Sequence, residues 1–374
     1  TKAGELAPSL YSDVDELCAL AGGLSDAGAG VFQIIPAPAE PAEVEFPILR
    51  RVAEKSGRPV SFTLLEVPGQ PGEGWKYHLA GLAQAAADGL TMHGQVAPRP
   101  VGMFFGLDLS LHHFSSHPSY RTIAHLTLAE RVEAMRDPAF RSRLLAEAPE
   151  DTNPTTLMLI AAFRAAYQWD DQPNYEPQHD DRVDARAAAA GQSLDEYAYD
   201  ALLRDDGRAV FYLPAANYAQ GTLKSVREML GRPYTVMALA DGGAHYGLIC
   251  DASFPTYFLQ RWVRDAAQDE AIGLPDAIAE LTSKAAGMIG LTDRGRIAVG
   301  LKADVNLIDL PALKLHVPTI EYDLPAGGKR LHQRVEGITA TIVSGVVTYR
   351  NGVHTGALPG RLVRRAEPAV AAAA

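Results

Sequence analysis

Apolar and polar positions follow two rhythms along the first three quarters of the chain. Compact apolar runs such as "GVFQIIP", "PVSFTLLE" and "YTVMALA" have the length of buried strands. Segments such as "EFPILRRVAEKSG" and "WKYHLAGLAQAAADG" repeat apolar residues at helical spacing and stop at a glycine. Strands that are apolar on both faces and alternate with amphipathic helices predict an α/β fold, with a parallel sheet covered by helices. The five predicted strands lie near residues 31–36, 59–65, 90–97, 209–213 and 235–240.

The pattern changes in two further regions. Residues 110–205 are longer than an ordinary crossover and contain helical runs such as "LTLAERVEAM" and "SLDEYAYDALLRDDG". After residue 294, "RGRIAVGLKADVNLIDL" and "ITATIVSGVVTYRNGVHTG" alternate with period two, and "RNG" predicts a hairpin turn. We therefore predict one domain over residues 1–294, with 110–205 as a mostly helical insertion. Residues 295–374 are predicted to form a small β-sandwich domain with a frayed tail.

Composition narrows the classes of partner. The net charge is −11 and the chain has no basic blocks, which argues against nucleic acid and anionic membrane surfaces. No apolar run approaches the roughly 20 residues that a membrane span needs. Cys18 and Cys250 are the only cysteines, so a disulfide framework is excluded. We expect a cytoplasmic protein that acts on a small molecule.

Polar residues follow the predicted strands, where the chemistry of parallel α/β proteins gathers. The guanidinium fork of Arg99 matches a substrate carboxylate, although a salt bridge to one of the many acids is an equal alternative. Asp241, in "ALADGGAH", is by itself an ordinary turn residue, and only the convergence of the strand ends favours a functional role. The candidate residues that line a pocket are Glu66, Gln95, Arg99, Asn217, Tyr218, Asp241 and His245.

Other histidines are weaker candidates. "LHHFSSHP" contains His112, His113 and His117, but adjacent side chains point apart on a strand and no acid is nearby in the sequence. A loop role is favoured over a metal role for this cluster. His93 lies inside a predicted strand, where a histidine satisfied within the barrel is favoured over a ligand.

One stretch resembles a known family. "GRIAVGLKADVNLID" has the form Gly-x-Ile-x-x-Gly-x-x-Ala-Asp-(x)4-Asp, from Gly295 to Asp309. It resembles the C-terminal signature of the amidohydrolase superfamily. Together with "ALADGGAH", "LTSKAAGMIGL" and "VVTYRNGVHTGALPGRLVR", it is similar to the D-aminoacylase (N-acyl-D-amino-acid deacylase) branch. The resemblance covers about residues 205–365 and implies the later part of a (β/α)8, TIM-like barrel with a flanking β-sandwich.

The resemblance also implies a reaction. Asp241 stands where the last barrel strand of such enzymes ends in an aspartate that binds the metal and shuttles a proton. A carboxylate suits both tasks, because it is a ligand for Zn²⁺ and accepts a proton from an attacking water. The implied function is metal-dependent hydrolysis of the C–N amide bond in a small N-acyl amino acid or related amide.

Two departures modify this expectation. No His-x-His, the metal pair of the first barrel strand, occurs in the sequence, and five strands are three short of a closed barrel. Ile35 and Leu64 replace the branch's two further histidine ligands. We therefore expect one zinc ion rather than two, an N-terminal part of the barrel that is missing or on another chain, and an oligomer. The alternative is a catalytically silent scaffold or binding subunit that keeps the fold. Ile35 and Leu64 favour that alternative, whereas the intact Asp241-Gly-Gly-x-His favours an enzyme.

Overall fold

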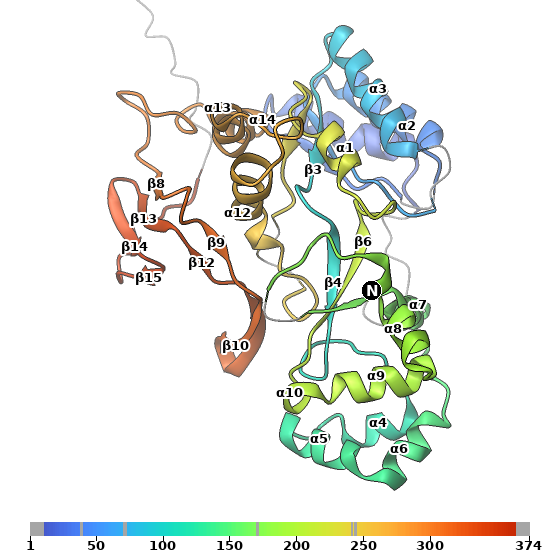
Figure 1. Cartoon of the computed structure of the whole chain (residues 1–374). Helices are drawn as coiled ribbons and strands as arrows, with labels where there is room; N and C mark the ends of the chain where they lie inside the picture. Colours follow the sequence, from blue (N-terminus) through green and yellow to red (C-terminus); the bar gives the residue numbers. More distant parts are fainter. Residues whose placement is uncertain are drawn as a thin grey trace, which may run out of the picture.

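The structure is a computed structural model, and it describes residues 11–37, 40–69, 73–169, 172–240, 242 and 245–363. Three regions are distinguishable in Figure 1: a helix-covered parallel sheet, a helical insertion and a C-terminal β lobe. Residues 364–374, which include most of the predicted frayed tail, lie outside the described residues. Among the described residues, none of the helices has the length and apolar character needed to traverse a lipid bilayer.

The parallel sheet contains four of the five predicted strands. They are hydrogen-bonded in the order of the chain, without the reversal that an open doubly wound sheet would show. Strands β1 and β7 are its two edges. The strands are β1 (Phe32–Ile34), β2 (Val60–Thr63), β3 (Met92–Val96) and β7 (Thr235–Met237).

The two faces of this sheet differ. Helices α1 (Val14–Asp26), α2 (Ala42–Ser56) and α3 (Gly74–Ala87) form the helical layer beside it, and Phe62 and Leu64 are completely buried. A Cβ at Gly94 would lie 2.9 Å from Leu64 Cδ2, so glycine permits this close packing. The strand register places Gln33, Ser61 and His93 together on the other face. The prediction that these strands are apolar on both faces is therefore wrong.

The fifth predicted strand exists but belongs to another sheet. Residues 211–216 form β6, which pairs antiparallel with β4 (Val101–Phe105) and β5 (Tyr167–Gln168). A Cβ at Gly102 would lie 2.5 Å from the Leu213 carbonyl oxygen, so glycine allows the two strands to approach. The apolar run was correctly read as a strand, but an apolar run does not specify its partner. Placing it in the parallel sheet is wrong.

Short helices with their own core make up the insertion. Phe105, Phe163 and Phe211 are fully buried in a cluster separate from the core of the parallel sheet. Figure 1 shows these helices below the parallel sheet. They are α4 (Pro118–Ile123), α5 (Leu128–Arg136), α6 (Pro138–Leu145), α7 (Pro154–Ala162), η3 (Phe163–Ala165), η4 (His179–Asp181), α8 (Val183–Ala190), α9 (Leu194–Leu202) and α10 (Arg204–Gly207); α11 (Lys224–Met229) follows β6.

Two helical segments with π-type turns follow β7. The Glu280 carboxylate in the second segment accepts a hydrogen bond from the Met237 backbone N–H at 3.1 Å and so satisfies a donor on the edge strand β7. The first segment is η5 (Asp251–Ser253), α12 (Phe254–Phe258) and η6 (Leu259–Arg264), and the second is α13 (Leu274–Ala279), η7 (Glu280–Lys284) and α14 (Ala285–Met288).

The C-terminal lobe consists of antiparallel strands. Asn351 and Gly352 have φ of 48° and 79°, as a two-residue type I′ turn requires, which confirms the predicted "RNG" hairpin. The Asp304 carboxylate accepts a hydrogen bond from the Ser344 backbone N–H at 2.9 Å and ties the signature loop to the sheet. The described strands are β8 (Val305–Ile308), β13 (Ile338–Val343), β14 (Val346–Arg350) and β15 (Val353–His354) in one sheet, β9 (Lys314–Leu315) with β12 (Val335–Glu336), and β10 (Thr319–Leu324) with β11 (Gly328–His332), the last two joined by η8 (Pro325–Gly327).

Candidate functional site

The loop after β7 carries backbone strain on both sides of the predicted catalytic residue. Asp241 itself lies outside the described residues. Leu239 has a φ of 67° and His245 a φ of 52°, a region that non-glycine residues seldom enter. Such strain persists where the surrounding structure enforces it, and it gathers at functional sites. The chain therefore holds the ends of this loop in an unusual conformation.

Glu66 and Asn217 join the ends of two strands. The Glu66 backbone N–H donates to Asn217 Oδ1 at 2.9 Å, and the Asn217 backbone N–H donates to the Glu66 carbonyl at 2.8 Å. Asn217 Nδ2 also donates to the Ala97 carbonyl at 3.3 Å, just past β3. Asn217 is completely buried with a φ of 64°, which asparagine tolerates better than most residues. The geometry gives this asparagine a positioning role.

The Glu66 carboxylate lies beside a small cavity. Its Oε2 accepts from the Ser225 hydroxyl at 2.9 Å and from the Ala219 backbone N–H at 3.3 Å. Glu66 and Ala219 both line a cavity of about 190 Å³. Tyr218 donates its hydroxyl to the Pro177 carbonyl at 3.0 Å, and burial raises its pKa to about 12. Glu66 and Asn217 thus lie together, although Asn217 follows a strand of the antiparallel sheet rather than of the parallel one.

Gln95 faces the polar side of the parallel sheet. Its Oε1 accepts a hydrogen bond from Gln33 Nε2 at 3.1 Å, across β2. The side chain is buried, together with that of Ser61 on the same face. These residues supply amide and hydroxyl groups to a face that a helix-covered strand would normally fill with aliphatic side chains.

Arg99 has no exposed surface. Its Nη2 donates to the Cys250 carbonyl at 2.9 Å and to Ser253 Oγ at 3.1 Å, and Asp251 Oδ1 lies 3.6 Å away. The guanidinium carbon lies 3.7 Å from the centre of the Tyr175 ring. Nε and Nη1 are buried and have no hydrogen-bond partner among the described residues. Arg99 therefore forms an ion pair with Asp251, as the salt-bridge alternative expected. Its Nε and Nη1 groups remain as donors without an acceptor among the described residues.

A larger cavity lies between the loop after β7 and the C-terminal hairpin formed by β10 and β11. It measures about 420 Å³, and Gly242, Cys250 and Ser253 line one side. Arg330, His332 and other hairpin residues line the opposite side. Burial raises the pKa of the Cys250 thiol to about 11, so this cysteine is protonated and is no nucleophile at neutral pH. Arg99 lies behind the wall that Cys250 and Ser253 form.

The hairpin was missed as part of the site. "TIEYDLPAGGKRLH" alternates like a surface hairpin, and nothing in it indicates where its tip lies. In the structure, Tyr322 Oη donates to Asp108 Oδ2 at 2.5 Å and Lys329 Nζ to Asp108 Oδ1 at 2.9 Å. The Leu331 backbone N–H donates to the Tyr246 carbonyl at 2.8 Å. These contacts hold the hairpin against both the turn after β4, which precedes the insertion, and the post-β7 loop.

The described residues do not form a metal site by themselves. No group of three or more His, Cys, Asp or Glu side chains among them has suitable geometry. Ile35 is 70% exposed and Leu64 is buried, and neither side chain can ligate a metal. His113 Nε2 lies 2.6 Å from Asp195 Oδ1, so the His112–His117 cluster does have an acid partner, supplied by α9. His93 Nδ1 is buried without a partner among the described residues, so the expectation of a satisfied histidine is not met at that atom.

The fold and this site together define an α/β protein whose parallel sheet delivers polar residues to the carboxyl ends of its strands, followed by antiparallel C-terminal sheets. A model of the Amidohydrolase family matches residues 4–349. The chain belongs to this family.

Solved structures of similar fold include D-aminoacylases and an N-acyl-D-glutamate deacylase. A D-aminoacylase mutant in complex with copper chloride matches with a TM-score of 0.56 and 16% identity, covering 96% of this chain and 61% of that one. A D-aminoacylase from work on its binuclear metal center matches with a TM-score of 0.54 and 16% identity, covering 94% and 59%. An N-acyl-D-glutamate deacylase from Bordetella bronchiseptica, complexed with zinc and a phosphonate inhibitor, gives 0.50 and 16%, covering 91% and 57%.

These likenesses establish the fold. The chain spans about three fifths of the length of the solved chains that it matches. No curated protein sequence matches the chain.

Proposed function

We propose that this chain carries the later strands of a (β/α)8 barrel and contributes to hydrolysis of the C–N amide bond in a small N-acyl amino acid. Asp241 is the proposed catalytic residue, and the 420 Å³ cavity beside the post-β7 loop is the proposed substrate site. The observation that carries the proposal is this juxtaposition: a strained loop at the carboxyl end of β7 borders a cavity of the size that small-molecule sites have.

The charges around this cavity support an anionic substrate. Arg99 lies behind one wall and keeps two unpaired donors. Arg330, on the opposite wall, pairs with Asp323 through Nε and Nη2 at 2.8 Å each. A substrate carboxylate that contacts the Arg330 guanidinium, which lines the cavity, gains a charge-assisted hydrogen bond, and such bonds are stronger than neutral ones. An N-acyl amino acid carries such a carboxylate next to its amide bond.

The described residues hold no metal-binding cluster, so a metal would need ligands beyond them. When bound, zinc polarises a carbonyl oxygen and lowers the pKa of water. We propose that Asp241 is the one ligand that this chain supplies and that it also accepts a proton, and that a His-x-His pair on further polypeptide completes a one-zinc site. Asp241 is close to the cavity in sequence, because Gly242 lines it.

The test is Asp241→Asn in the complete, metal-loaded protein. Asparagine keeps the volume and suits turns equally well, so the free energy of unfolding should not change. Loss of general-base assistance lowers turnover by roughly a hundred- to ten-thousand-fold. Asp205→Asn is the matched control, because Asp205 is exposed and lies in the insertion. Turnover close to the unsubstituted enzyme in Asp241→Asn would return this aspartate to a turn role.

A silent scaffold is the second candidate. It is favoured by Ile35 and Leu64 and by the lack of a metal-binding cluster among the described residues. Metal content and amide hydrolysis of the complete protein separate the two functions: a protein with neither is a scaffold, and one with both is a hydrolase.

A further inference from the structure

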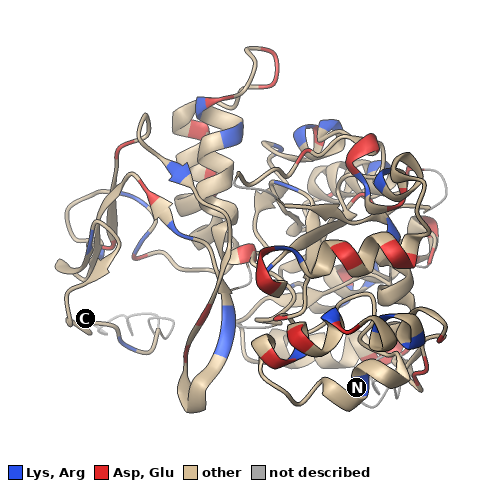
Figure 2. Cartoon of the chain, turned by 60° about the horizontal axis from the view of Figure 1, so that its bottom comes forward, with Lys and Arg blue, Asp and Glu red and all other residues tan. Residues whose placement is uncertain are grey.

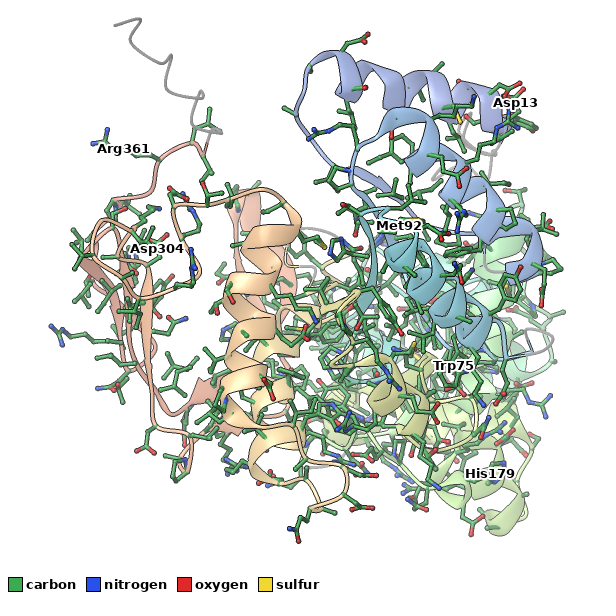
Figure 3. All side chains as sticks on the ribbon, turned by 90° about the horizontal axis from the view of Figure 1, so that it is seen from above. Asp13, Trp75, Met92, His179, Asp304 and Arg361 are labelled. Carbon is green, nitrogen blue, oxygen red and sulfur yellow. The ribbon has the colours of Figure 1, made fainter. Side chains whose placement is uncertain are left out.

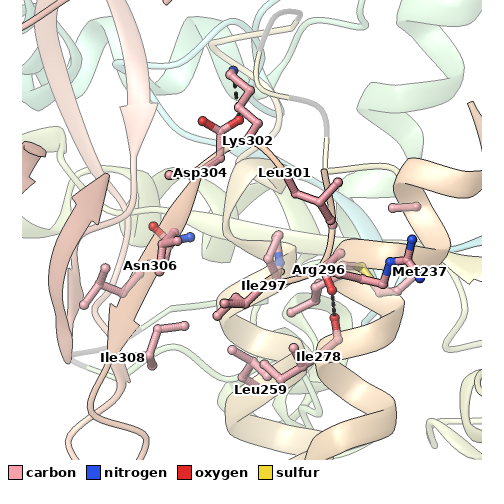
Figure 4. Close-up of a pocket in the computed structure, with 18 of the residues that line it drawn as sticks. Met237, Leu259, Ile278, Arg296, Ile297, Leu301, Lys302, Asp304, Asn306 and Ile308 are labelled. Atoms are coloured by element: carbon pink, nitrogen blue, oxygen red, sulfur yellow. Dashed lines mark hydrogen bonds and ion pairs between the residues drawn. The ribbon is translucent and has the colours of Figure 1, made fainter. Parts of the chain in front are cut away.

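Two cavities lie on different sides of the helical segment formed by α13, η7 and α14. Ile278 and Leu281 line the first, a mainly aliphatic cavity of about 630 Å³ that the segment shares with β8 (Figure 4). Asp276, Glu280 and Lys284 line the second, which measures about 530 Å³. Residues three and four positions apart share one face of a helix, so the segment is apolar toward one cavity and charged toward the other.

The charged cavity lies at the amino end of β7. Residues 230–233, which form the turn between α11 and β7, line it. Asp241 follows the same strand at its carboxyl end, and the charged cavity shares no lining residue with the proposed substrate site. In parallel α/β folds the catalytic groups gather at the carboxyl ends of the strands. A ligand of the charged cavity therefore binds apart from the proposed reaction.

Two arginines of this cavity have neutral partners only. Arg227 Nε and Nη2 donate to the backbone carbonyls of Glu270 and Ala271 at 2.6 and 3.4 Å. Arg232 Nε donates to the backbone carbonyl of Glu228 at 3.0 Å. Neither guanidinium forms an ion pair with a carboxylate of the described residues. Both therefore keep an uncompensated charge, and Arg227 Nη1 and both Nη groups of Arg232 have no acceptor within the described parts of the chain.

The turn that carries Arg232 is held in place. Gly231 has a φ of 75°, which allows the chain to turn between α11 and β7. Thr235 Oγ1 donates to the Met229 carbonyl at 2.7 Å and closes the turn. Lys284 Nζ donates to the Arg232 carbonyl at 2.6 Å, which joins the helical segment to the turn. The two sides of the cavity are thus fixed relative to each other.

Positive charge exceeds negative charge in this cavity. Glu280 pairs with Lys284, so these two charges offset each other. Arg227 and Arg232 then remain against Asp276, the other carboxylate of the lining. This excess occurs in a chain whose net charge is −11. A cavity that keeps positive charge in such an acidic chain favours an anionic ligand.

We propose that this cavity binds a phosphate group, either as free phosphate or as part of a small organic molecule. A phosphate group carries a charge of about −1.5 to −2 and three acceptor oxygens, so it can accept hydrogen bonds from both guanidinium groups at once. A carboxylate has two oxygens, which a single guanidinium fork satisfies. Two arginines with free donors therefore match phosphate better than carboxylate.

The probe is inorganic phosphate, titrated into the full chain by calorimetry at neutral pH and constant ionic strength. Binding should be saturable and should raise the melting temperature, because a ligand that binds only the folded state stabilises it. Arg232→Gln should weaken phosphate binding at least roughly ten-fold, because it removes charge-assisted hydrogen bonds. Asp276→Asn should tighten binding roughly two- to five-fold, because it removes a charge of the same sign as the ligand.

Arg350→Gln is the matched control for the change in net charge. Arg350 is exposed on β14 in the C-terminal sheet, away from the cavity, and its replacement should leave phosphate binding unchanged. Glycerol phosphate distinguishes the two sources: tighter binding than that of inorganic phosphate indicates a small organic phosphate, and weaker binding indicates free phosphate.

Three results would overturn the proposal. The first is the absence of saturable binding by either phosphate. The second is an affinity that Arg232→Gln leaves unchanged, or that Arg350→Gln lowers as much as Arg232→Gln does. The third is tighter binding of the dicarboxylate succinate than of both phosphates, because the cavity would then be a carboxylate site.

Discussion

The insertion and the C-terminal sheet bury their apolar residues to very different extents. In the insertion and the strands that flank it, Phe105 on β4, Phe163 on η3 and Phe211 on β6 are fully buried within one cluster. Among the described residues of the β8–β13–β14–β15 sheet, only Ala340 and Thr348 are buried. Figure 2 shows charged residues distributed over the helices, whereas the C-terminal sheet is mostly uncharged. The insertion therefore completes its own core, and the sheet does not.

The low burial of the C-terminal sheet determines how the C-terminal lobe is anchored to the rest of the molecule. A sheet needs another layer against which to bury one face, and a sheet without such a layer gains little from its apolar side chains. Leu313, Leu315 and Leu331 of the lobe join the main core, so the lobe is anchored through its base rather than through its four-stranded sheet. In Figure 3, Asp304 lies in the C-terminal lobe, well apart from Trp75 and Met92 in the first region.

The largest expected effect contrasts one aromatic side chain of the cluster that the insertion shares with β4 and β6 and one of the C-terminal sheet. Phe211→Ala removes a ring whose centre lies 5.0 Å from that of Phe163, and it should lower the free energy of unfolding by about 3–5 kcal/mol. Tyr349→Ala, at a residue 44% exposed on β14, should cost less than about 1 kcal/mol. Chemical denaturation measures both. Equal losses would show that the sheet has a core like that of the insertion.

The sequence predicted most of the parallel sheet, because its strands are short apolar runs between amphipathic helices. It did not predict β4, since "VGMFF" follows β3 after only a few residues and looks like part of the same loop. Once β4 is present, β6 pairs with it and leaves the parallel sheet. Strand pairing depends on partners far along the chain, and a local pattern carries no such information.

The candidate site was predictable only in part, because several of its contacts depend on residues that are far apart in the sequence. Glu66 and Asn217 do lie together, but the reason given for this was wrong, because Asn217 follows β6, which belongs to the antiparallel sheet and not to the parallel one. Whether Arg99 meets a substrate or an acid depends on Asp251, which is distant in sequence. The contribution of Arg330 to the cavity depends on where a long hairpin comes to rest. Both contacts arise from tertiary structure, and the spacing of residues in the sequence does not predict them.

Acid should weaken the insertion through His112. Burial and then the charge of Arg131 lower the pKa of His112 from 6.5 to about 3. Between these values the unfolded chain binds a proton that the folded chain does not, so stability is complete above pH 6.5 and falls as the pH drops toward 3. At pH 4.5 this one histidine costs about 2–3 kcal/mol.

His112→Gln, which does not titrate, is the matched control for this effect. Unfolding measured at pH 7 and pH 4.5 should show a larger loss for the unsubstituted chain than for the variant. If both lose the same free energy, His112 does not account for the acid sensitivity of the insertion.

A smaller effect concerns the contact between Asp108, which follows β4, and the hairpin of β10 and β11. Asp108→Asn removes the charge that accepts hydrogen bonds from Tyr322 and Lys329, and the hairpin should lose about 1–3 kcal/mol of docking free energy. Faster hydrogen exchange across β10 and β11 is the readout. Asp323→Asn, whose carboxylate is 52% exposed and pairs within the hairpin, should leave the docking unchanged. Equal exchange in the two variants would mean that Asp108 does not hold the hairpin.

The smallest effect concerns a local signal at one helix of the insertion. Ser193 begins α9 with a capping box: its hydroxyl accepts from the Glu196 backbone N–H at 3.2 Å, and the Glu196 carboxylate accepts from the Ser193 N–H at 2.9 Å. Ser193→Ala should cost about 1 kcal/mol, because a helix N–H then loses its acceptor, whereas Ser193→Gly should cost only a few tenths. Thermal unfolding of both variants measures the difference. Because Asp195 in the same turn contacts His113, fraying of α9 would also loosen the histidine loop, and Ser193→Ala should then be the more sensitive of the two to acid. Identical melting of the alanine and glycine variants would show that packing alone, and not the cap, fixes the start of this helix.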